Sequence, residues 1–404
     1  MSLRNIVVVG ASVAGLRAVE TLRREGFEGD ITLVSGEPHA PYDRPPLSKQ
    51  ILTSEIGPAE LQYREIDWFA QQEVTLRLGE HAEQLDVRAK RLRIGGQWLR
   101  YDGLIVATGA RARKLHTGRA LKGIHTLRTI DDALAIRESI LPGTRVVIIG
   151  AGFVGSEVAS SAASSGAQVT LLEVAETAMS RAVGAQLGHV FARLHEEFGV
   201  NLVCKARVTG FGGNDRVQFV RLADGWELPA DLVVVGIGVE PNTEWLSDSG
   251  LTLDDGLLCD DTLNAGPETV YAAGDVVAWP NAWWGGVMRG EQWLVAADQG
   301  MHAAQNLLLG RARARPFSTI PYFWTDQYGC RIQVAGRTDL GEAVSLIGDP
   351  SQRPFLCAYR HGNEITGVFA IDAPRAFATL RSRMQQHRGF ATATEGVSAL
   401  ADAD

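Results

Sequence analysis

Two glycine-rich turns have the residue types and spacing that indicate chemistry in this sequence. The first is Gly10-Ala11-Ser12-Val13-Ala14-Gly15, after the apolar run 6–9, and the second is Gly150-Ala151-Gly152-Phe153-Val154-Gly155, after the apolar run 146–149. A buried strand that enters such a turn and then a helix aims backbone N–H groups at a pyrophosphate. One match also fits a plain strand–turn–helix crossover, but two in strand context are far stronger evidence. The pattern predicts that the chain holds two dinucleotides and passes electrons between them.

An acidic residue follows each turn at the distance expected for binding a ribose. Glu173 ends the strand after the second turn, and Glu37 follows strand 31–34, where Ser35-Gly36-Glu37 leaves the register open by one residue. A carboxylate at this place accepts hydrogen bonds from the ribose hydroxyls and repels a 2′-phosphate. The nearest arginine that could hold such a phosphate, Arg181, lies well beyond Glu173. We therefore expect NADH rather than NADPH at the second turn.

The cysteines do not form a redox pair or a metal-ligand pattern. They are widely scattered, without a CxxC motif, and the expected state is buried or unreactive thiols: Cys204, Cys259, Cys330 and Cys357. Disulfide reductases with two nucleotide sites carry a cysteine pair soon after the first site, whereas no cysteine precedes Cys204 here. We expect the electrons to leave for an external carrier rather than through a thiol.

Composition limits the class of protein. The chain has 404 residues, 45% apolar and 21% charged, which suggests two or three globular domains with ample core. The formal net charge of −8 disfavours non-specific binding to nucleic acid or to membranes. No apolar stretch approaches the roughly 20 residues needed to span a bilayer. The sequence runs directly into a strand without a signal peptide, and we expect a cytoplasmic protein.

The apolar periodicity predicts an α/β fold with two Rossmann-like domains and a small C-terminal α+β domain. Each nucleotide turn leads into a helix (15–25 and 155–165) and then a strand (31–34 and 169–172). Later predicted elements are strands 232–236 and 270–275, a helix at 292–309, short alternating strands after Tyr322, a helix at 375–386 and a frayed polar tail.

Several motifs in order along the chain resemble one enzyme family. They are 10–15, PYDRPPLSK at 41–49, Ala107-Thr108-Gly109, 127–129, 150–155, 236–238, 273–275, 289–293 and YFWTDQY at 322–328. Together they resemble the FAD-dependent ferredoxin reductases that serve bacterial cytochrome monooxygenases and ring-hydroxylating dioxygenases. The PPLSK and FWTDQY segments are the specific ones. The resemblance implies a glutathione-reductase-like fold, with an FAD-binding domain at 1–111 and 237–316, an NAD-binding domain at 112–236 and a C-terminal α+β domain at 317–404.

The resemblance also implies site residues. For FAD they are Gly10, Ser12, Ala14, Gly15, Gly36, Glu37, Arg44, Lys49, Ala82, Ala107, Thr108, Gly109, Arg128, Gly274, Asp275, Glu291, Gln292 and Trp293. For NADH they are Gly150, Gly152, Phe153, Val154, Gly155, Glu157, Glu173, Gly236, Ile237 and Gly238. Lys49, Glu157 and Trp293 are the predicted catalytic residues, and no metal is expected. The alternative interpretations are that Lys49 is a surface lysine, that Glu157 is an ordinary first-turn glutamate and that Trp293 packs in the core.

The implied reaction transfers a hydride from NADH to FAD and then single electrons to a two-iron ferredoxin. Ferredoxins are usually acidic, so basic residues are the candidates for docking: Arg311, Arg313, Arg315 and Arg331, with Trp324. Trp324 could instead pack in the core, and Arg311, Arg313 and Arg315 could lie in a solvated loop. The choice between a monomer and a weak dimer also stays open. The alternative functions are a flavoenzyme reducing oxygen, a peroxide, rubredoxin or another small acceptor, and a redox-sensing binding protein.

Overall fold

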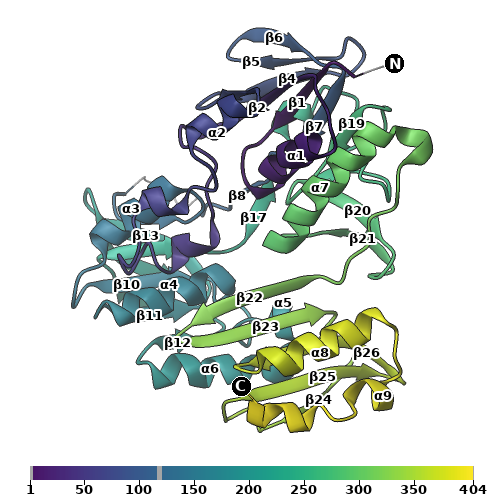
Figure 1. Cartoon of the computed structure of the whole chain (residues 1–404). Coiled ribbons are helices and arrows are strands. Elements are labelled where there is room, and N and C mark those ends of the chain that lie inside the picture. The colour runs from purple at the N-terminus through teal and green to yellow at the C-terminus, as the bar shows by residue number, and fades with distance from the viewer. Residues whose placement is uncertain (1–2, 116–120, 404) are drawn as a thin grey trace. The chain divides into compact units, whose positions relative to one another are not determined.

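The computed structural model describes residues 3–115 and 121–403 (Figure 1). The chain forms two compact units. Unit 1 contains Met1–Asp43, Ala59–Arg111 and Val239–Pro321, and unit 2 contains Arg44–Pro58, Ala112–Gly238 and Tyr322–Asp404. The chain passes between them after Asp43, after Pro58, within β8 (Ala110–Ala112), on entering β17 (Val239–Pro241) and after Pro321. Among the residues described, no helix is long and apolar enough to cross a membrane.

A five-stranded parallel sheet forms the centre of unit 1. Its order is β19-β7-β1-β2-β3, with β1 (Asn5–Val9), β2 (Asp30–Val34), β3 (Val74–Arg77), β7 (Gly103–Val106) and β19 (Val270–Ala272). The central strands are almost fully buried, as expected for a parallel sheet covered on both faces. Helices α1 (Val13–Arg24) and α7 (Trp293–Leu309) pack against each other in this unit (Figure 1). Parallel strands end at one edge, which places the first glycine turn beside the residues that follow β2 and β7.

Smaller elements complete unit 1. One antiparallel sheet contains β4 (Ala82–Asp86), β5 (Arg91–Ile94) and β6 (Gln97–Arg100). Another three-stranded sheet contains β18 (Leu257–Leu258), β20 (Val277–Asn281) and β21 (Gly286–Arg289). Helix α2 (Ile66–Gln71) packs on β3.

Unit 2 repeats the nucleotide-binding arrangement. Its parallel sheet has the order β12-β11-β10-β16-β9, with β9 (Ile124–Thr126), β10 (Arg145–Ile149), β11 (Gln168–Leu172), β12 (Asn201–Val203) and β16 (Leu232–Val235). The helices of this segment are α3 (Ile130–Ser139), α4 (Phe153–Ser164), α5 (Ser180–Val183) and α6 (Gly188–Glu197). An antiparallel sheet contains β13 (Val208–Gly213), β14 (Val217–Leu222) and β15 (Glu227–Pro229).

The C-terminal part of unit 2 is an antiparallel sheet with helices. The order is β22-β23-β26-β25-β24, with β22 (Tyr322–Gln327), β23 (Cys330–Gly336), β24 (Glu342–Ile347), β25 (Phe355–His361) and β26 (Glu364–Ile371). Helix α8 (Pro374–Gln385) buries Phe377 and Leu380, and α9 (Phe390–Thr394) follows. The expectation of a frayed tail is wrong, because Ala393 and Val397 are fully buried and anchor it.

The predicted fold class is confirmed. Two Rossmann-like parallel sheets and a small C-terminal α+β part are present, and the predicted helices 15–25, 155–165 and 292–309 correspond to α1, α4 and α7. Unit 2 contains both the predicted NAD-binding segment and the predicted C-terminal segment, together with residues 44–58. The three-domain division therefore stays a prediction.

Candidate active site

The first glycine turn, in unit 1, is closed by contacts that exclude larger residues. Gly10 has a φ of +110°, and a Cβ on it would lie 2.0 Å from the carbonyl oxygen of Ala107. A Cβ on Gly15 would lie 1.8 Å from the carbonyl oxygen of Gly10. Both glycines are therefore required for strand, turn and helix to approach this closely.

The second turn, in unit 2, repeats this geometry. A Cβ on Gly150 would lie 2.3 Å from Gly236 O, and one on Gly155 would lie 1.9 Å from Gly150 O. Gly152 has φ −85° and ψ −167°, and Ser12 at the matching place has φ −81° and ψ −170°. This extended backbone suits any residue, so Ser12 introduces no strain. No atom lies within 4 Å of a Cβ built on Gly152, which leaves space for a pyrophosphate beside the N-terminus of α4.

The edge of the unit 1 sheet gathers several of the predicted FAD residues. Ala107 donates its N–H to Val9 O, beside the first turn, and Thr108 exchanges two hydrogen bonds of 2.9 Å with Asn242. Gly109 O accepts the N–H of Asn242. Asn242, which sequence reasoning missed, thus holds the segment after β7.

The predicted adenosine end of the FAD site lies at the segment after β2. The Tyr42 hydroxyl donates a hydrogen bond of 2.5 Å to Glu37 Oε2. A Cβ on Gly36 would lie 2.5 Å from His81 Cε1, and His81 immediately precedes Ala82, so Gly36 and Ala82 belong to one neighbourhood.

A buried glutamine of α7, Gln299, binds the segment after β19, which lies beside the first turn. Gln299 Oε1 accepts the N–H of Gly274 at 2.8 Å, and a Cβ on Gly274 would lie 3.1 Å from the Cβ of Ala14. Gln299 is fully buried, and its Nε2 has no hydrogen-bond partner among the residues that the structure describes. A buried donor of this kind requires an acceptor, and a bound FAD would offer several. Asp275, the next residue along the chain, is half-buried. Gln299 was missed, although a polar residue among apolar helix positions is a signal.

Trp293 begins α7 and is anchored by polar residues of unit 1. Its indole Nε1–H lies 2.9 Å from both Asp43 Oδ1 and the Tyr63 hydroxyl oxygen, and Tyr63 donates to the same carboxylate oxygen at 2.6 Å. Burial, and then the hydrogen bond to Asp43, raises the pKa of Tyr63, which therefore stays a donor. Gln292 occupies the N-cap position without a side-chain capping bond, and Glu291 is exposed and paired with Arg289 at 2.8 Å.

Arg44 and Arg128, both predicted to lie at FAD, contact each other in unit 2. Arg44 Nη1 donates a hydrogen bond of 2.6 Å to the carbonyl oxygen of Arg128. The Arg128 N–H is bonded to Asp132 Oδ2 at 2.9 Å, in the capping box that Thr129 forms at the start of α3. This helix start therefore fixes the backbone that Arg44 contacts.

Glu173 folds back onto the second glycine turn. Its Oε2 accepts the Ala151 N–H at 2.8 Å, and its Oε1 accepts the Ala175 N–H at 2.9 Å. The carboxylate is thereby held at the end of β11, next to the turn.

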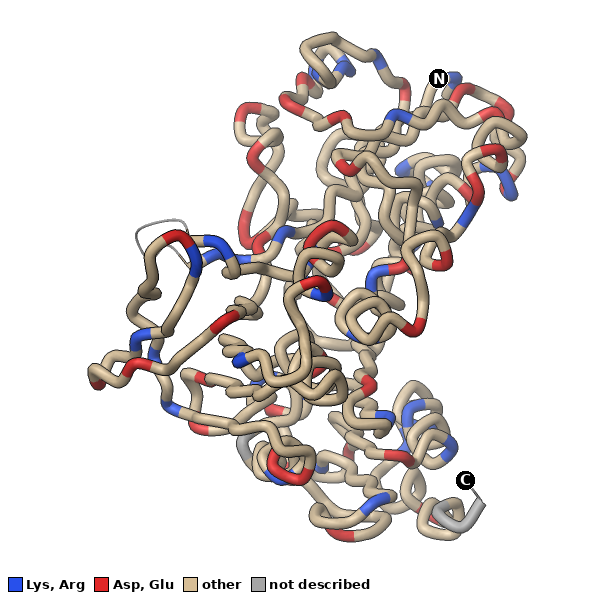
Figure 2. The backbone as a smooth tube through the Cα atoms, turned by 90° about the vertical axis from the view of Figure 1, so that its left-hand side faces the viewer, with Lys and Arg blue, Asp and Glu red and all other residues tan. Residues whose placement is uncertain are grey.

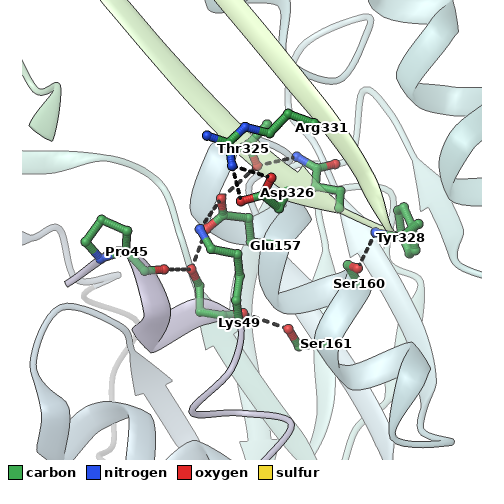
Figure 3. A network of polar contacts seen from close by, with 11 residues as sticks. Pro45, Lys49, Glu157, Ser160, Ser161, Thr325, Asp326, Tyr328 and Arg331 are labelled. Atoms are coloured by element: carbon green, nitrogen blue, oxygen red, sulfur yellow. Dashed lines mark hydrogen bonds and ion pairs between the residues drawn. The ribbon is translucent and has the colours of Figure 1, made fainter. Parts of the chain in front are cut away.

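The predicted residues Lys49 and Glu157 form a buried ion pair in unit 2 (Figure 3). Lys49 Nζ lies 3.0 Å from Glu157 Oε1, which also accepts a hydrogen bond of 2.7 Å from Thr325. Ser48 donates to the other carboxylate oxygen, Oε2. Only 6% of Glu157 is exposed, so its carboxylate is held away from water. Sequence reasoning missed Ser48 and Thr325 as partners.

Other residues predicted for NADH lie around the start of α4 and the end of β16. The ring of Phe153 packs on Phe323 with centroids 3.9 Å apart, and Val154 is 40% exposed. Gly236 O contacts the second turn, Ile237 is half-buried, and Gly238 O accepts the Arg113 N–H at 2.9 Å.

The predicted docking residues lie in both units. Arg311, Arg313 and Arg315 are exposed in unit 1, where Arg311 and Arg313 donate to backbone carbonyls. In unit 2, the Arg331 guanidinium lies over the Trp324 ring at 5.3 Å and pairs with Asp326. Figure 2 shows basic and acidic residues interspersed along the backbone.

All four cysteines are free thiols. Burial raises the pKa of each, in the case of Cys357 to about 12. Reactive cysteines have a lowered pKa, so these thiols are poorly suited to carry electrons.

Comparisons with known proteins agree with this arrangement. Residues 4–300 match the pyridine nucleotide-disulphide oxidoreductase family, and residues 322–402 match the reductase C-terminal domain. The chain is 36% identical to rhodocoxin reductase of Rhodococcus erythropolis, over 92% of this chain and 87% of that protein. It is 36% identical to the ferredoxin–NAD(+) reductase component of the anthranilate 1,2-dioxygenase system of Burkholderia cepacia, over 94% of each.

Among solved structures, the crystal structure of the covalent putidaredoxin reductase–putidaredoxin complex matches with a TM-score of 0.92 and 28% identity, over 99% of each chain. The resemblance predicted from the motifs is therefore confirmed, and so are the predicted cofactors FAD and NADH, which this family uses. The chain belongs to the pyridine nucleotide-disulphide oxidoreductase family, with the C-terminal domain of its ferredoxin reductases.

Proposed function

We propose that this oxidoreductase takes a hydride from NADH onto FAD and passes the electrons one at a time to a two-iron ferredoxin that serves an oxygenase. The observation that carries the proposal is the pair of matching glycine turns in a chain whose four cysteines are all free. Relatives named as ferredoxin–NAD(+) reductase components support the acceptor class. A cytochrome monooxygenase or a ring-hydroxylating dioxygenase is the expected final consumer.

FAD, when bound, supplies both the hydride acceptor and the release of single electrons. The protein supplies positioning. The first glycine turn binds the FAD pyrophosphate, the second binds that of NADH, and Arg44 and Arg128 add positive charge on the FAD side. Trp293 packs on the flavin, with its indole held by Asp43.

Lys49 and Glu157 are proposed to control charge and orientation where hydride transfer takes place. The Lys49 ammonium would place a positive charge beside a bound flavin, since opposite charges attract strongly away from water. Glu157 faces the nicotinamide and holds the Lys49 ammonium at 3.0 Å. The side chains of Lys49 and Glu157 are 13% and 8% exposed, so water competes little with this contact.

Glu173 selects NADH over NADPH. Its carboxylate, fixed by two backbone N–H groups, accepts from the ribose hydroxyls and repels a 2′-phosphate. Arg331 with Trp324, and the run containing Arg311, Arg313 and Arg315, are proposed to attract an acidic ferredoxin. A cytoplasmic location and a monomer or weak dimer stay predictions.

The test is anaerobic titration of the purified protein with NADH and NADPH, followed by addition of a two-iron ferredoxin. We expect a flavin spectrum that NADH bleaches, and ferredoxin reduction that depends on NADH. Equal turnover with oxygen, a peroxide or rubredoxin would favour a different acceptor. Slow turnover with every ferredoxin, together with an NADH-dependent change in oligomeric state, would favour a redox sensor.

A further inference from the structure

We propose that Thr325, on the C-terminal sheet, is a positioning residue that fixes the carboxylate of Glu157 for hydride transfer. The inference rests on the proposed function, because it acts through Glu157. It adds a side chain from outside the nucleotide-binding segments to the NADH half of the reaction.

Three side chains bond to the carboxylate of Glu157, with Lys49 and Thr325 at Oε1 and Ser48 at Oε2. Lys49 is attached through a long flexible side chain and can follow the carboxylate as it moves. Thr325 is β-branched, lies within β22 and is fully buried, so its hydroxyl has few positions available. The short Thr325 bond of 2.7 Å therefore restricts Glu157 Oε1 more than the Lys49 contact does.

The Thr325 hydroxyl is itself oriented by a neighbour. A threonine hydroxyl has one proton to donate, and Gln327 Nε2 donates to Thr325 Oγ1 at 3.1 Å. The oxygen accepts from Gln327, which leaves its proton for Glu157. Gln327 is 1% exposed, so water does not replace it.

The position of β22 is set by the turn that follows it (Figure 3). Gln327 pairs with Cys330, so Tyr328 and Gly329 form a two-residue hairpin turn. Tyr328 has a φ of +54°, a conformation that such turns usually give to Asn or Gly. The strained residue is held by its contacts, since its N–H donates to Ser160 Oγ at 2.7 Å.

The Tyr328 side chain makes two further contacts, one with α6 and one with the residue that follows it. Its hydroxyl lies 2.7 Å from His195 Nδ1, and its ring stacks on Phe198 with centroids 4.6 Å apart. The turn is thus docked on both α4 and α6, and α4 is the helix that carries Glu157. Three residues before Tyr328, Thr325 reaches the carboxylate from a strand that cannot shift freely.

The test measures flavin reduction by NADH in anaerobic stopped-flow experiments with the FAD-loaded full chain. We expect T325V to lower the limiting rate about tenfold while the Kd for NADH changes less than about twofold, because a hydrogen bond to a charged group is lost away from the binding contacts. T325S should restore the rate. The matched control is T366V, because Thr366 lies in the same sheet and its hydroxyl bonds to Tyr359 O.

E157Q separates this inference from the proposed function. We expect it to slow reduction, and T325V added to E157Q to have little further effect. Normal rates in T325V with slow E157Q would overturn the positioning role alone, as would additive effects or failure of T325S to restore the rate. Normal rates in E157Q would overturn both this inference and the role of Glu157. If T325V does not retain FAD, T325A replaces it in the same comparisons.

Discussion

The indole nitrogen of Trp293 lies 2.9 Å from Asp43 Oδ1, although 250 residues separate the two in the sequence. An indole has one N–H to donate, and a carboxylate is a strong acceptor for it. The Tyr63 hydroxyl bonds to the same oxygen and completes the group. The helix start at Trp293 is therefore tied to the segment that begins the PYDRPPLSK motif.

This relationship predicts the effect of W293F. Loss of the N–H removes a hydrogen bond to a charged group, and we expect a stability loss of about 1.5–3 kcal/mol. If Trp293 packs on the flavin, the visible flavin band also changes. Thermal unfolding and absorption spectra measure both effects. The control is W98F, since Trp98 is 42% exposed and stacks on Arg91. An unchanged flavin band in W293F would argue against stacking.

Replacement of Glu173 should weaken selection for NADH. We expect E173A to raise the KM for NADH about tenfold and to narrow the gap to NADPH, because the ribose loses its acceptor and the repulsive charge is gone. Steady-state kinetics with both nucleotides measure this. E176A is the control, since Glu176 is exposed and pairs with Lys205 on the surface. The same nucleotide preference in E173A and the native protein would contradict the assignment.

The second glycine turn predicts that an added methyl group has different effects on stability at Gly155 and at Gly152. In G155A the new methyl would lie 1.9 Å from Gly150 O, and we expect a stability loss of about 2 kcal/mol or more. In G152A it would meet no protein atom within 4 Å, so stability should stay within about 0.5 kcal/mol.

The Kd for NADH should nevertheless rise about tenfold in G152A, because the methyl occupies space that the pyrophosphate needs. Unfolding experiments and NADH titrations separate the two effects. Native affinity in a stable G152A protein would show that the pyrophosphate binds elsewhere.

Because His195 is buried, we expect the folded protein to lose stability in mild acid. Burial lowers its pKa from 6.5 to about 4, so the folded protein keeps this ring neutral where the unfolded chain binds a proton. The contribution of neutral His195 to the free energy of unfolding is complete above pH 6.5 and is lost as the pH falls towards 4. At about pH 5.5 the free energy of unfolding is lower by about 1.4 kcal/mol. Urea unfolding at about pH 7.5 and pH 5.5 measures it.

H195Q should flatten this pH dependence, whereas H361Q should retain it, since His361 is exposed. An equally steep loss of stability in H195Q would assign the acid sensitivity to other groups.

Local sequence predicted the parts of this protein that depend on near neighbours. The glycine turns, the parallel strands and the acidic residue after β11 follow from spacing of a few residues and from the alternation of apolar runs. Ser12 occupies the place that Gly152 has in the second turn, and its extended backbone suits a serine without strain.

Tertiary structure decided which side chains meet. Thr325 reaches Glu157 across 168 residues, and Gln299 reaches Gly274 from a different element. The helical tail follows the same rule, because Ala393 and Val397 gain their burial from elements that only the fold supplies. Such contacts depend on how distant segments pack, and neither periodicity nor motif spacing encodes which buried donor faces which acceptor.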